Sequence, residues 1–351
     1  MASSAETFSL GMPVEIGEID RELKKLWAES GNARTRASLM NLAVYSEEPD
    51  SLPSNTAMIF KITEDHACRA IVINANPEAK ENHVEAWISA HCHVSRAGNK
   101  QICSEQLSFL LKGPSAKLLP NIVFSHLDSD LPFYLWWQGE FHDPMDPQLW
   151  AWVDRVIYDS QTWSDFDTQM RRVETAQAEA KQRIVLCDLN WTRLVHFRLG
   201  IAQIFDHPRT HSRFNEIESV VIDFAPGYRS TALLLVGWLA AQLNWSLEKK
   251  SKNNQVAFRD RSNKLIQVSL NEKEGEPIGG CIVNFGSRKV CVNYSANSDL
   301  LDVTVRAEDA KRTCLIPAGS NDPVRLMSEE LMRGGPHRVY LRAMNAMRSL
   351  L

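Results

Sequence analysis

The sequence has no marked excess of charge of either sign and no long apolar run. Lysine and arginine total 39, aspartate and glutamate total 43, and the formal net charge is −4. A chain with this balance of charges has no general attraction for nucleic acid or for an anionic membrane. We therefore expect neither as a partner. The longest apolar run, 232–241, is shorter than the roughly 20 residues that span a bilayer. No apolar leader precedes Arg21, so we expect a cytoplasmic protein without a secretory signal.

Cysteine is too sparse and too scattered to form a disulfide framework. The seven cysteines are an odd number without regular spacing, at positions 68, 92, 103, 187, 281, 291 and 314. Disulfide scaffolds are typical of small secreted domains, so we expect reduced thiols in this chain.

The familiar catalytic motifs are also missing. The sequence contains no glycine-rich phosphate loop ending in Lys-Ser/Thr, no Gly-x-Gly-x-x-Gly, no His-Glu-x-x-His, no Gly-x-Ser-x-Gly and no Cys-x-x-Cys. We therefore expect a protein that is not an enzyme and that holds no cofactor or metal, although catalytic sites can also be assembled from distant residues.

A chain of 351 residues predicts two domains, here 1–185 and 186–351. The first alternates short apolar runs with helical stretches, which indicates an α/β domain with a mixed sheet and flanking helices. We expect its strands at 39–45, 68–73, 87–94, 101–111, 133–137 and 155–158, and its main helices at 16–30, 55–63, 119–127 and 149–153. The strands 87–94 and 101–111 flank a turn at 97–99, which predicts an antiparallel hairpin.

The second domain is expected to be α+β. A polar helix, 165–183, links it to the first, and Asp188 caps its first helix. After a strand at 219–224 and a buried helix at 231–245, apolar residues recur with period two, which predicts an antiparallel meander. Its strands are expected at 256–258, 265–270, 281–285, 289–294 and 301–306, and two helices close the chain.

The most metal-like cluster is His91-Cys92-His93. Side chains of a strand alternate, so the two histidines share one face and Cys92 points to the other, where it reads as a small core residue. A metal would need further ligands that the sequence does not nominate, and the alternative is a solvated or hydrogen-bonded histidine pair.

Glu105 falls on the apolar face of its predicted strand. A buried carboxylate must be paired, and the nearest candidates are Arg36 and Arg69, each of which lies beside a predicted strand. One interpretation is a structural ion pair, and the other is a pocket that faces a ligand or a partner.

Further candidate residues flank the predicted strands 133–137 and 155–158. Asp130 precedes the first strand, which ends in Trp136-Trp137; these tryptophans point to opposite faces, so at most one is a surface anchor. Arg155 begins the second strand, and Asp159 follows it. Carboxylates at strand ends can mark a ligand crevice, but they also cap neighbouring helices.

Several segments, in order, resemble the OpcA family of glucose-6-phosphate dehydrogenase assembly proteins. They are Arg36-Ala-Ser-Leu-Met-Asn-Leu, His66-Ala-Cys-Arg-Ala-Ile-Val, Ile102-Cys-Ser-Glu-Gln, Asp130-Leu-Pro with Leu135-Trp-Trp, Asp154-Arg-Val-Ile-Tyr-Asp-Ser, Asp188-Leu-Asn-Trp-Thr-Arg-Leu, Leu235-Val-Gly-Trp-Leu-Ala, and Glu330-Leu with Gly334-Gly-Pro and Tyr340.

The resemblance implies a non-catalytic accessory protein that binds glucose-6-phosphate dehydrogenase and promotes its assembly or allosteric activation. The candidates for a partner or ligand surface are Arg36, Arg69, Glu105, Asp130, Trp136, Trp137, Arg155 and Asp159. The alternative is a sugar-phosphate enzyme or sensor, with Arg36, Arg69 and Arg155 holding the phosphate in a crevice of the first domain.

Cys281 and Cys291 flank Gly286-Ser287 and resemble a disulfide pair. A two-residue turn at this position pairs Cys281 with Val292 and Ile282 with Cys291, which sets the two sulfurs on opposite faces. This register also gathers the apolar side chains on one face, and a buried face determines the register. We therefore predict that Cys281 and Cys291 form no disulfide with each other.

Overall fold

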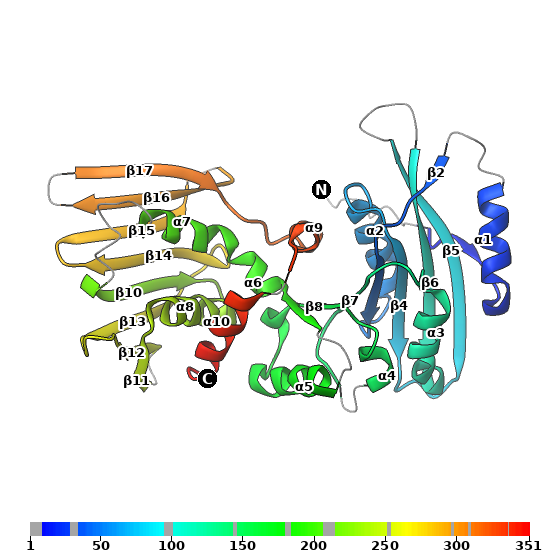
Figure 1. Ribbon diagram of the computed structural model, residues 1–351, viewed down its shortest axis with the longest axis horizontal. Coiled ribbons are helices and arrows are strands. Elements are labelled where there is room, and N and C mark those ends of the chain that lie inside the picture. Colours follow the sequence, from blue (N-terminus) through cyan, green and yellow to red (C-terminus); the bar gives the residue numbers. More distant parts are fainter. Residues whose placement is uncertain are drawn as a thin grey trace. The chain divides into compact units, whose positions relative to one another are not determined.

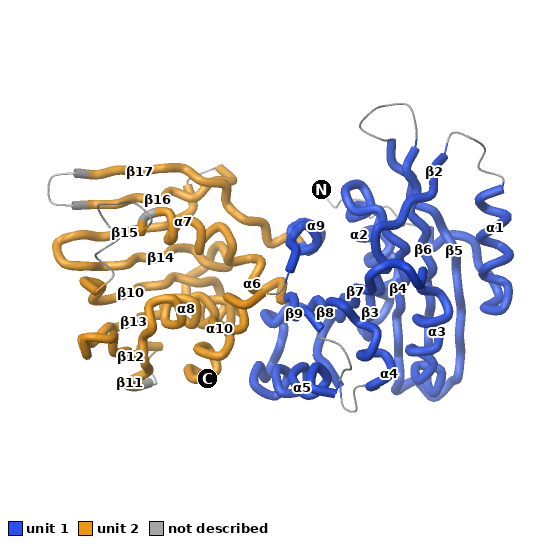
Figure 2. The backbone as a smooth tube through the Cα atoms, in the orientation of Figure 1, with its two compact units in different colours: residues 1–187, 323–335 blue, residues 188–322, 336–351 orange. Residues whose placement is uncertain are grey.

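The computed structural model describes residues 9–28, 34–94, 101–142, 146–179, 184–205, 215–250, 254–295, 298–307, 310–335 and 337–351. Two compact units are distinguished by their internal contacts (Figure 2). Unit 1 comprises residues 1–187 and 323–335, and unit 2 comprises residues 188–322 and 336–351. The expected boundary at 185/186 lies beside the first crossing at 187/188. Residues 323–335, which we expected in the second domain, belong to unit 1.

Unit 1 is built on a mixed sheet (Figure 1). Its strands are β1 (Met12–Pro13), β2 (Arg34–Arg36), β3 (Asn41–Ser46), β4 (Arg69–Asn76), β5 (His83–Val94), β6 (Gln101–Lys112), β7 (Phe133–Trp137), β8 (Arg155–Tyr158) and β9 (Val185–Asp188). Its helices are η1 (Ile16–Glu18), α1 (Ile19–Ala28), α2 (Ser51–Ile62), η2 (Gly113–Leu118), α3 (Leu119–His126), α4 (Pro147–Trp150), η3 (Ser160–Thr162), α5 (Phe166–Glu179) and α9 (Pro323–Met332).

The strand order of this sheet is β1-β5-β6-β4-β3-β7-β8-β9, with β2 paired to β6. Strands β6, β4, β3, β7 and β8 run parallel, and β5 is antiparallel to β6. The connections β3–α2–β4 and β6–α3–β7 run in opposite directions across the sheet, so right-handed crossovers place α2 and α3 on opposite faces. The switch between the two directions lies between β3 and β7.

The α/β layers and the antiparallel hairpin β5–β6 confirm the fold class expected for the first half of the chain. The predicted turn at 97–99 and the end of the first helix at 31–32 lie outside the described residues. The polar helix is α5, which buries Phe166, Met170 and Val173 in unit 1 and is followed by the unpredicted strand β9.

Unit 2 also contains one sheet with helices (Figure 1). Its strands are β10 (Ile217–Phe224), β11 (Ser246–Lys250), β12 (Gln255–Arg259), β13 (Leu265–Glu272), β14 (Ile278–Phe285), β15 (Arg288–Tyr294), β16 (Leu300–Ala307) and β17 (Ala310–Pro317). Its helices are α6 (Leu189–Arg193), α7 (Val195–Phe205), α8 (Arg229–Leu243) and α10 (Arg338–Arg348).

The order of the second sheet is β11-β12-β13-β10-β14-β15-β16-β17. The predicted antiparallel pairing is present between β12 and β13 and from β14 to β16, and the unpredicted strand β17 extends it. Strand β10, however, lies between β13 and β14 and runs parallel to β13. The expectation of a purely antiparallel meander is therefore wrong at this point. Alternation of apolar side chains identifies strands and their faces, but it does not determine the order in which strands pair.

The predicted register of β14 and β15 is confirmed. Cys281 lies opposite Val292 and Ile282 lies opposite Cys291. Both cysteines are free thiols. Gly286 has a φ of 55°, as the first position of a type II′ turn requires.

Among the helices of the described ranges, none combines the length and the apolar character that a membrane-spanning helix requires.

Candidate functional site

A buried ion-pair cluster lies under α1. Glu105 of β6 is 1% exposed. Its carboxylate lies 3.1 Å from Nε of Arg36 and 3.6 Å from a terminal nitrogen of Arg69. The indole Nε1 of Trp27 on α1 donates a hydrogen bond to the same carboxylate. The sequence-based pairing of Glu105 with arginine is therefore confirmed, and it involves both candidate arginines.

The position of this cluster favours the structural interpretation. Arg69 begins β4, and Arg36 ends β2 opposite Cys103, so the cluster lies toward the amino ends of the parallel strands. Ligands of open parallel sheets bind at the carboxyl ends. Glu105 consequently neutralises arginines inside unit 1 and joins α1 to the sheet through Trp27.

The histidine pair lies on the opposite face, under α2. Nε2 of His91 is 2.8 Å from the side-chain oxygen of Gln106, whose amide donates to Oγ1 of Thr56 on α2. Nε2 of His93 is 3.0 Å from Oγ1 of Thr63. Burial lowers the pKa of His91, so its neutral form is favoured. These contacts confirm the hydrogen-bonded interpretation of the histidine pair.

Cys92 and Cys103 form a disulfide between β5 and β6. The expectation that every cysteine is reduced is therefore wrong for this pair. The register of the hairpin places the two residues directly opposite one another, with their Cα atoms 4.0 Å apart. Cys68, Cys187, Cys281, Cys291 and Cys314 are free.

The switch point between β3 and β7 is where an open sheet of this kind binds a dinucleotide. Such a site needs a glycine-rich turn, so that the phosphates can reach the amino end of the helix. Here β3 ends at Ser46 and is followed by Glu47-Glu48-Pro49-Asp50, and α2 begins at Ser51. The side-chain amide of Asn74 donates to the carbonyl oxygens of Ser46 and Glu48 and to Oγ of Ser51. The turn between β3 and α2 is therefore acidic and is hydrogen-bonded to Asn74 of β4.

Side-chain contacts also join the elements at the carboxyl ends of β3 and β7. Gln138, directly after β7, exchanges two amide hydrogen bonds of 2.8 and 3.1 Å with Asn55 of α2. Tyr45 and Trp137, near the ends of β3 and β7, stack with ring centroids 4.1 Å apart. Both contacts lie at the carboxyl ends of β3 and β7.

Both candidate tryptophans are buried. Trp136 and Trp137 are 4% and 9% exposed, so neither is a surface anchor. Trp137 contacts Phe141, which is fully buried and is also surrounded by Trp150, Tyr158 and Trp163.

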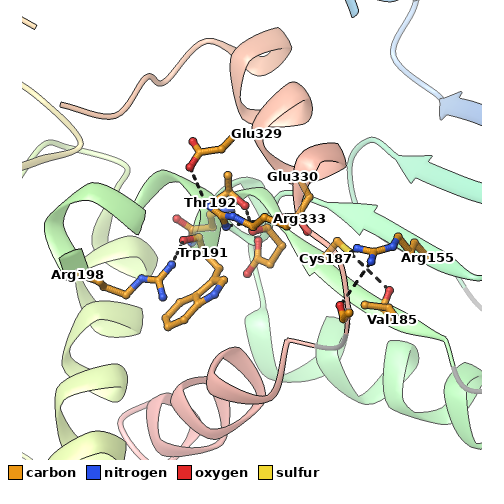
Figure 3. Close-up of polar contacts among 12 residues, drawn as sticks. Arg155, Val185, Cys187, Trp191, Thr192, Arg198, Glu329, Glu330 and Arg333 are labelled. Carbon is orange, nitrogen blue, oxygen red and sulfur yellow. Dashed lines mark hydrogen bonds and ion pairs between the residues drawn. The ribbon is translucent and has the colours of Figure 1, made fainter. Parts of the chain in front are cut away.

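Arg155 and Cys187 lie together where β8 begins and β9 ends (Figure 3). The guanidinium lies 3.7 Å from Sγ of Cys187 and 3.5 Å from the carbonyl oxygen of Gly335, both within unit 1. Burial and the nearby Glu330 carboxylate raise the pKa of the Cys187 thiol, so it is protonated near neutrality and is a poor nucleophile. Arg155 thus holds the last residue of the 323–335 segment.

The remaining candidate acids have different roles. Asp159 caps η3 by accepting a hydrogen bond from the backbone of Gln161. Asp130 is exposed on the turn before β7.

Trp152 is the surface residue that sequence reasoning missed. It is 60% exposed, while each of the other nine tryptophans is buried or half-buried. The available signal was its acidic surroundings, because the sequence from Leu118 to Asp154 contains no lysine or arginine.

In unit 2, hydrogen bonds organise the segment 188–194. Asp188 accepts from the backbone of Asn190 and, over 3.1 Å, from the hydroxyl of Tyr340. Oδ1 of Asn190 accepts from Thr231 on α8. These buried contacts tie α6 to α8 and α10, and they are structural.

Comparison with known families assigns both halves of the chain. Residues 60–175 match the glucose-6-phosphate dehydrogenase subunit N-terminal domain, and residues 184–344 match the corresponding C-terminal domain. The chain belongs to the OpcA family. The OpcA-like segments noted in the sequence coincide with the contacts described above: Glu105 with its arginines, Asp188 with Tyr340, and Arg155 with Gly335.

Two curated OpcA relatives show the extent of the similarity. The OxPP cycle protein OpcA of Nostoc punctiforme is 30% identical over 198 residues, which are 53% of this chain and 42% of that protein. The OxPP cycle protein OpcA of Synechococcus elongatus is 27% identical over 229 residues, 62% of this chain and 49% of that protein. The matched region thus spans less than half of each relative.

The fold is also found in an oxidoreductase from Bacillus cereus, with a TM-score of 0.51 over 89% of this chain and 94% of that chain. The sequence identity is 9%, so this similarity concerns the fold alone.

Proposed function

We propose that this protein binds glucose-6-phosphate dehydrogenase in the cytoplasm and promotes its assembly or allosteric activation without catalysing a reaction itself. The observation that carries the proposal is that both halves of the chain match domains described as parts of a glucose-6-phosphate dehydrogenase subunit.

The switch point of unit 1 supports the non-catalytic part of the proposal. Glu47, Glu48 and Asp50 stand where a dinucleotide-binding turn has glycines, and their charges repel a pyrophosphate. The Gln138–Asn55 amide pair and the Tyr45–Trp137 stack lie at the same ends of β3 and β7. The fold resembles that of an oxidoreductase, but the residues at the switch point of this chain do not favour the binding of a dinucleotide.

The sugar-phosphate alternative has less support. Arg36 and Arg69 are paired with Glu105 near the amino ends of the strands, away from the usual ligand edge. A surface cavity of about 460 Å³ lies beside β5, where residues 13–17 and 84–87 line it. Among the described residues that line it, the charged ones are Glu15 and Glu85, which would repel a phosphate.

Binding is tested by sedimentation velocity of the dehydrogenase from the same organism, alone and with the purified protein. We expect a faster-sedimenting boundary that contains both chains. The purified protein alone, with glucose 6-phosphate and NADP⁺, should produce no NADPH. Separate boundaries at micromolar concentrations would contradict the binding, and NADPH formation by the protein alone would contradict the non-catalytic part.

A further inference from the structure

An exposed tryptophan in an acidic segment marks a surface of unit 1. Trp152 follows α4 and is 60% exposed. Its ring contacts Phe124 of α3 with centroids 5.7 Å apart. Phe124 is half-buried, so the two rings form an apolar surface that holds Trp152 in place while leaving it open to water. Fixed, exposed aromatic side chains of this kind are enriched among the residues that dominate binding energy at protein interfaces.

Two carboxylates of one turn lie between these two aromatic residues in the sequence. Asp128 and Asp130 lie on the turn that follows α3. This turn leads into Phe133, which is bound to Asp154 by a backbone hydrogen bond of 2.9 Å and a side-chain hydrogen bond of 2.8 Å. Within the described ranges, neither Asp128 nor Asp130 takes part in an ion pair.

The whole segment has negative charge only. Between Leu118 and Asp154 the sequence has no lysine or arginine, and its carboxylates are Asp128, Asp130, Glu140, Asp143, Asp146 and Asp154. An arginine or lysine can pair with such carboxylates and can also lie over the face of an indole. The chemistry that fits this surface is therefore a basic one.

We propose that Trp152, Phe124, Asp128 and Asp130 form a docking surface for a lysine- or arginine-bearing surface of the dehydrogenase. The inference rests on the proposed function and names the contact through which the function is exerted. A second copy of this chain is a poorer occupant, because a twofold interface at this surface would bring the same acidic segment against itself.

The test compares full-length variants in binding to the dehydrogenase from the same organism. Trp152→Ala should weaken binding roughly 30-fold, as expected for a central aromatic anchor. Asp128→Asn/Asp130→Asn should slow association at low salt and weaken the salt dependence of binding. Leu199→Ala is the matched control, because Leu199 is 57% exposed but lies in unit 2; it should change binding less than about twofold.

A second measurement does not depend on any variant. Hydroxyl-radical footprinting of the complex should show protection of Trp152, with Met332, which is 78% exposed, as the internal reference. The inference would be overturned if the wild-type protein binds the dehydrogenase, Trp152→Ala binds it with the same affinity, and Trp152 is not protected in the complex. The proposed function would then remain intact. Absence of any wild-type binding would overturn both, and dimerisation of the protein through Trp152 would identify a second copy as the occupant and overturn the inference.

Discussion

At the scale of single residues, a buried carboxylate of unit 1 is neutralised by two arginines. Glu105 illustrates what sequence reasoning can reach. Alternation placed it on an apolar face, and the cost of an isolated buried charge required an arginine. The two arginines were candidates because each lies beside a predicted strand. The structure brings them to Glu105 on β2 and β4, which both pair with β6. The hydrogen bond from Trp27 was not predictable, because the sequence does not specify where α1 packs.

Glu105→Ala should lower the free energy of unfolding by about 3–5 kcal/mol, because Arg69 would be left buried without its counter-charge. Arg69 is 11% exposed on its side chain, so water cannot replace the carboxylate easily. Urea unfolding measures the change. The matched control is Glu18→Ala, which removes an exposed ion pair with Arg21 and should cost less than about 1 kcal/mol. Equal, small losses in both variants would show that Glu105 does not stabilise the fold.

Three histidines of unit 1 should make stability depend on pH. Burial lowers the pKa values of His66, His91 and His126 below their usual value of 6.5. The folded state then binds fewer protons than the unfolded state, so stability is full above about pH 6.5 and declines as the pH falls below it, by at most about 1.4 kcal/mol per pH unit for each histidine.

This prediction is checked by urea unfolding at several pH values between 7.5 and 5.5. His91→Gln should reduce the slope, because glutamine does not titrate. A stability that rises on acidification over this range would be the opposite of the expected sign.

At the scale of helices and strands, the sequence pattern predicts the strands themselves better than the order in which they pair. The turn at Gly286-Ser287 was predictable together with its register, since the buried face of β14 and β15 admits only one alignment. The insertion of β10 beside β13 was not predictable, because alternation of apolar side chains identifies strands but not the order in which they pair. The Cys92–Cys103 disulfide was missed for a related reason, since the register of β5 and β6 depends on the connection between them.

Helices α8 and α10 of unit 2 pack closely at Gly237, within the segment Leu235-Val-Gly-Trp. A Cβ atom there would lie 2.4 Å from the carbonyl oxygen of Ala343 and 2.9 Å from the backbone nitrogen of Met347. Gly237→Ala should therefore destabilise the protein by about 1–3 kcal/mol, although alanine is the better helix former. Gly17→Ala, in open space, is the control and should be nearly neutral in a thermal unfolding experiment. A more stable Gly237→Ala variant would refute the close approach of the two helices.

At the scale of the whole molecule, the α/β and α+β character of the two halves followed from the sequence, but the path of the chain between units did not. Residues 323–335 return to unit 1, where α9 contacts α2. This return depends on the surface against which α9 is buried. The pattern of apolar residues alone does not specify that surface. The pattern of apolar residues also did not show which tryptophans lie on the surface. Trp136 and Trp137 were chosen for their adjacency and are buried, whereas Trp152 is exposed.

The central claim is that the protein acts on glucose-6-phosphate dehydrogenase and not on a small substrate. The most direct test adds increasing amounts of the purified protein to a fixed concentration of the dehydrogenase from the same organism and follows NADPH formation at subsaturating glucose 6-phosphate. The account predicts that the rate rises and then reaches a plateau at a fixed molar ratio, at which the dehydrogenase also sediments as a larger species. An unchanged rate and an unchanged sedimentation coefficient throughout the titration would contradict it.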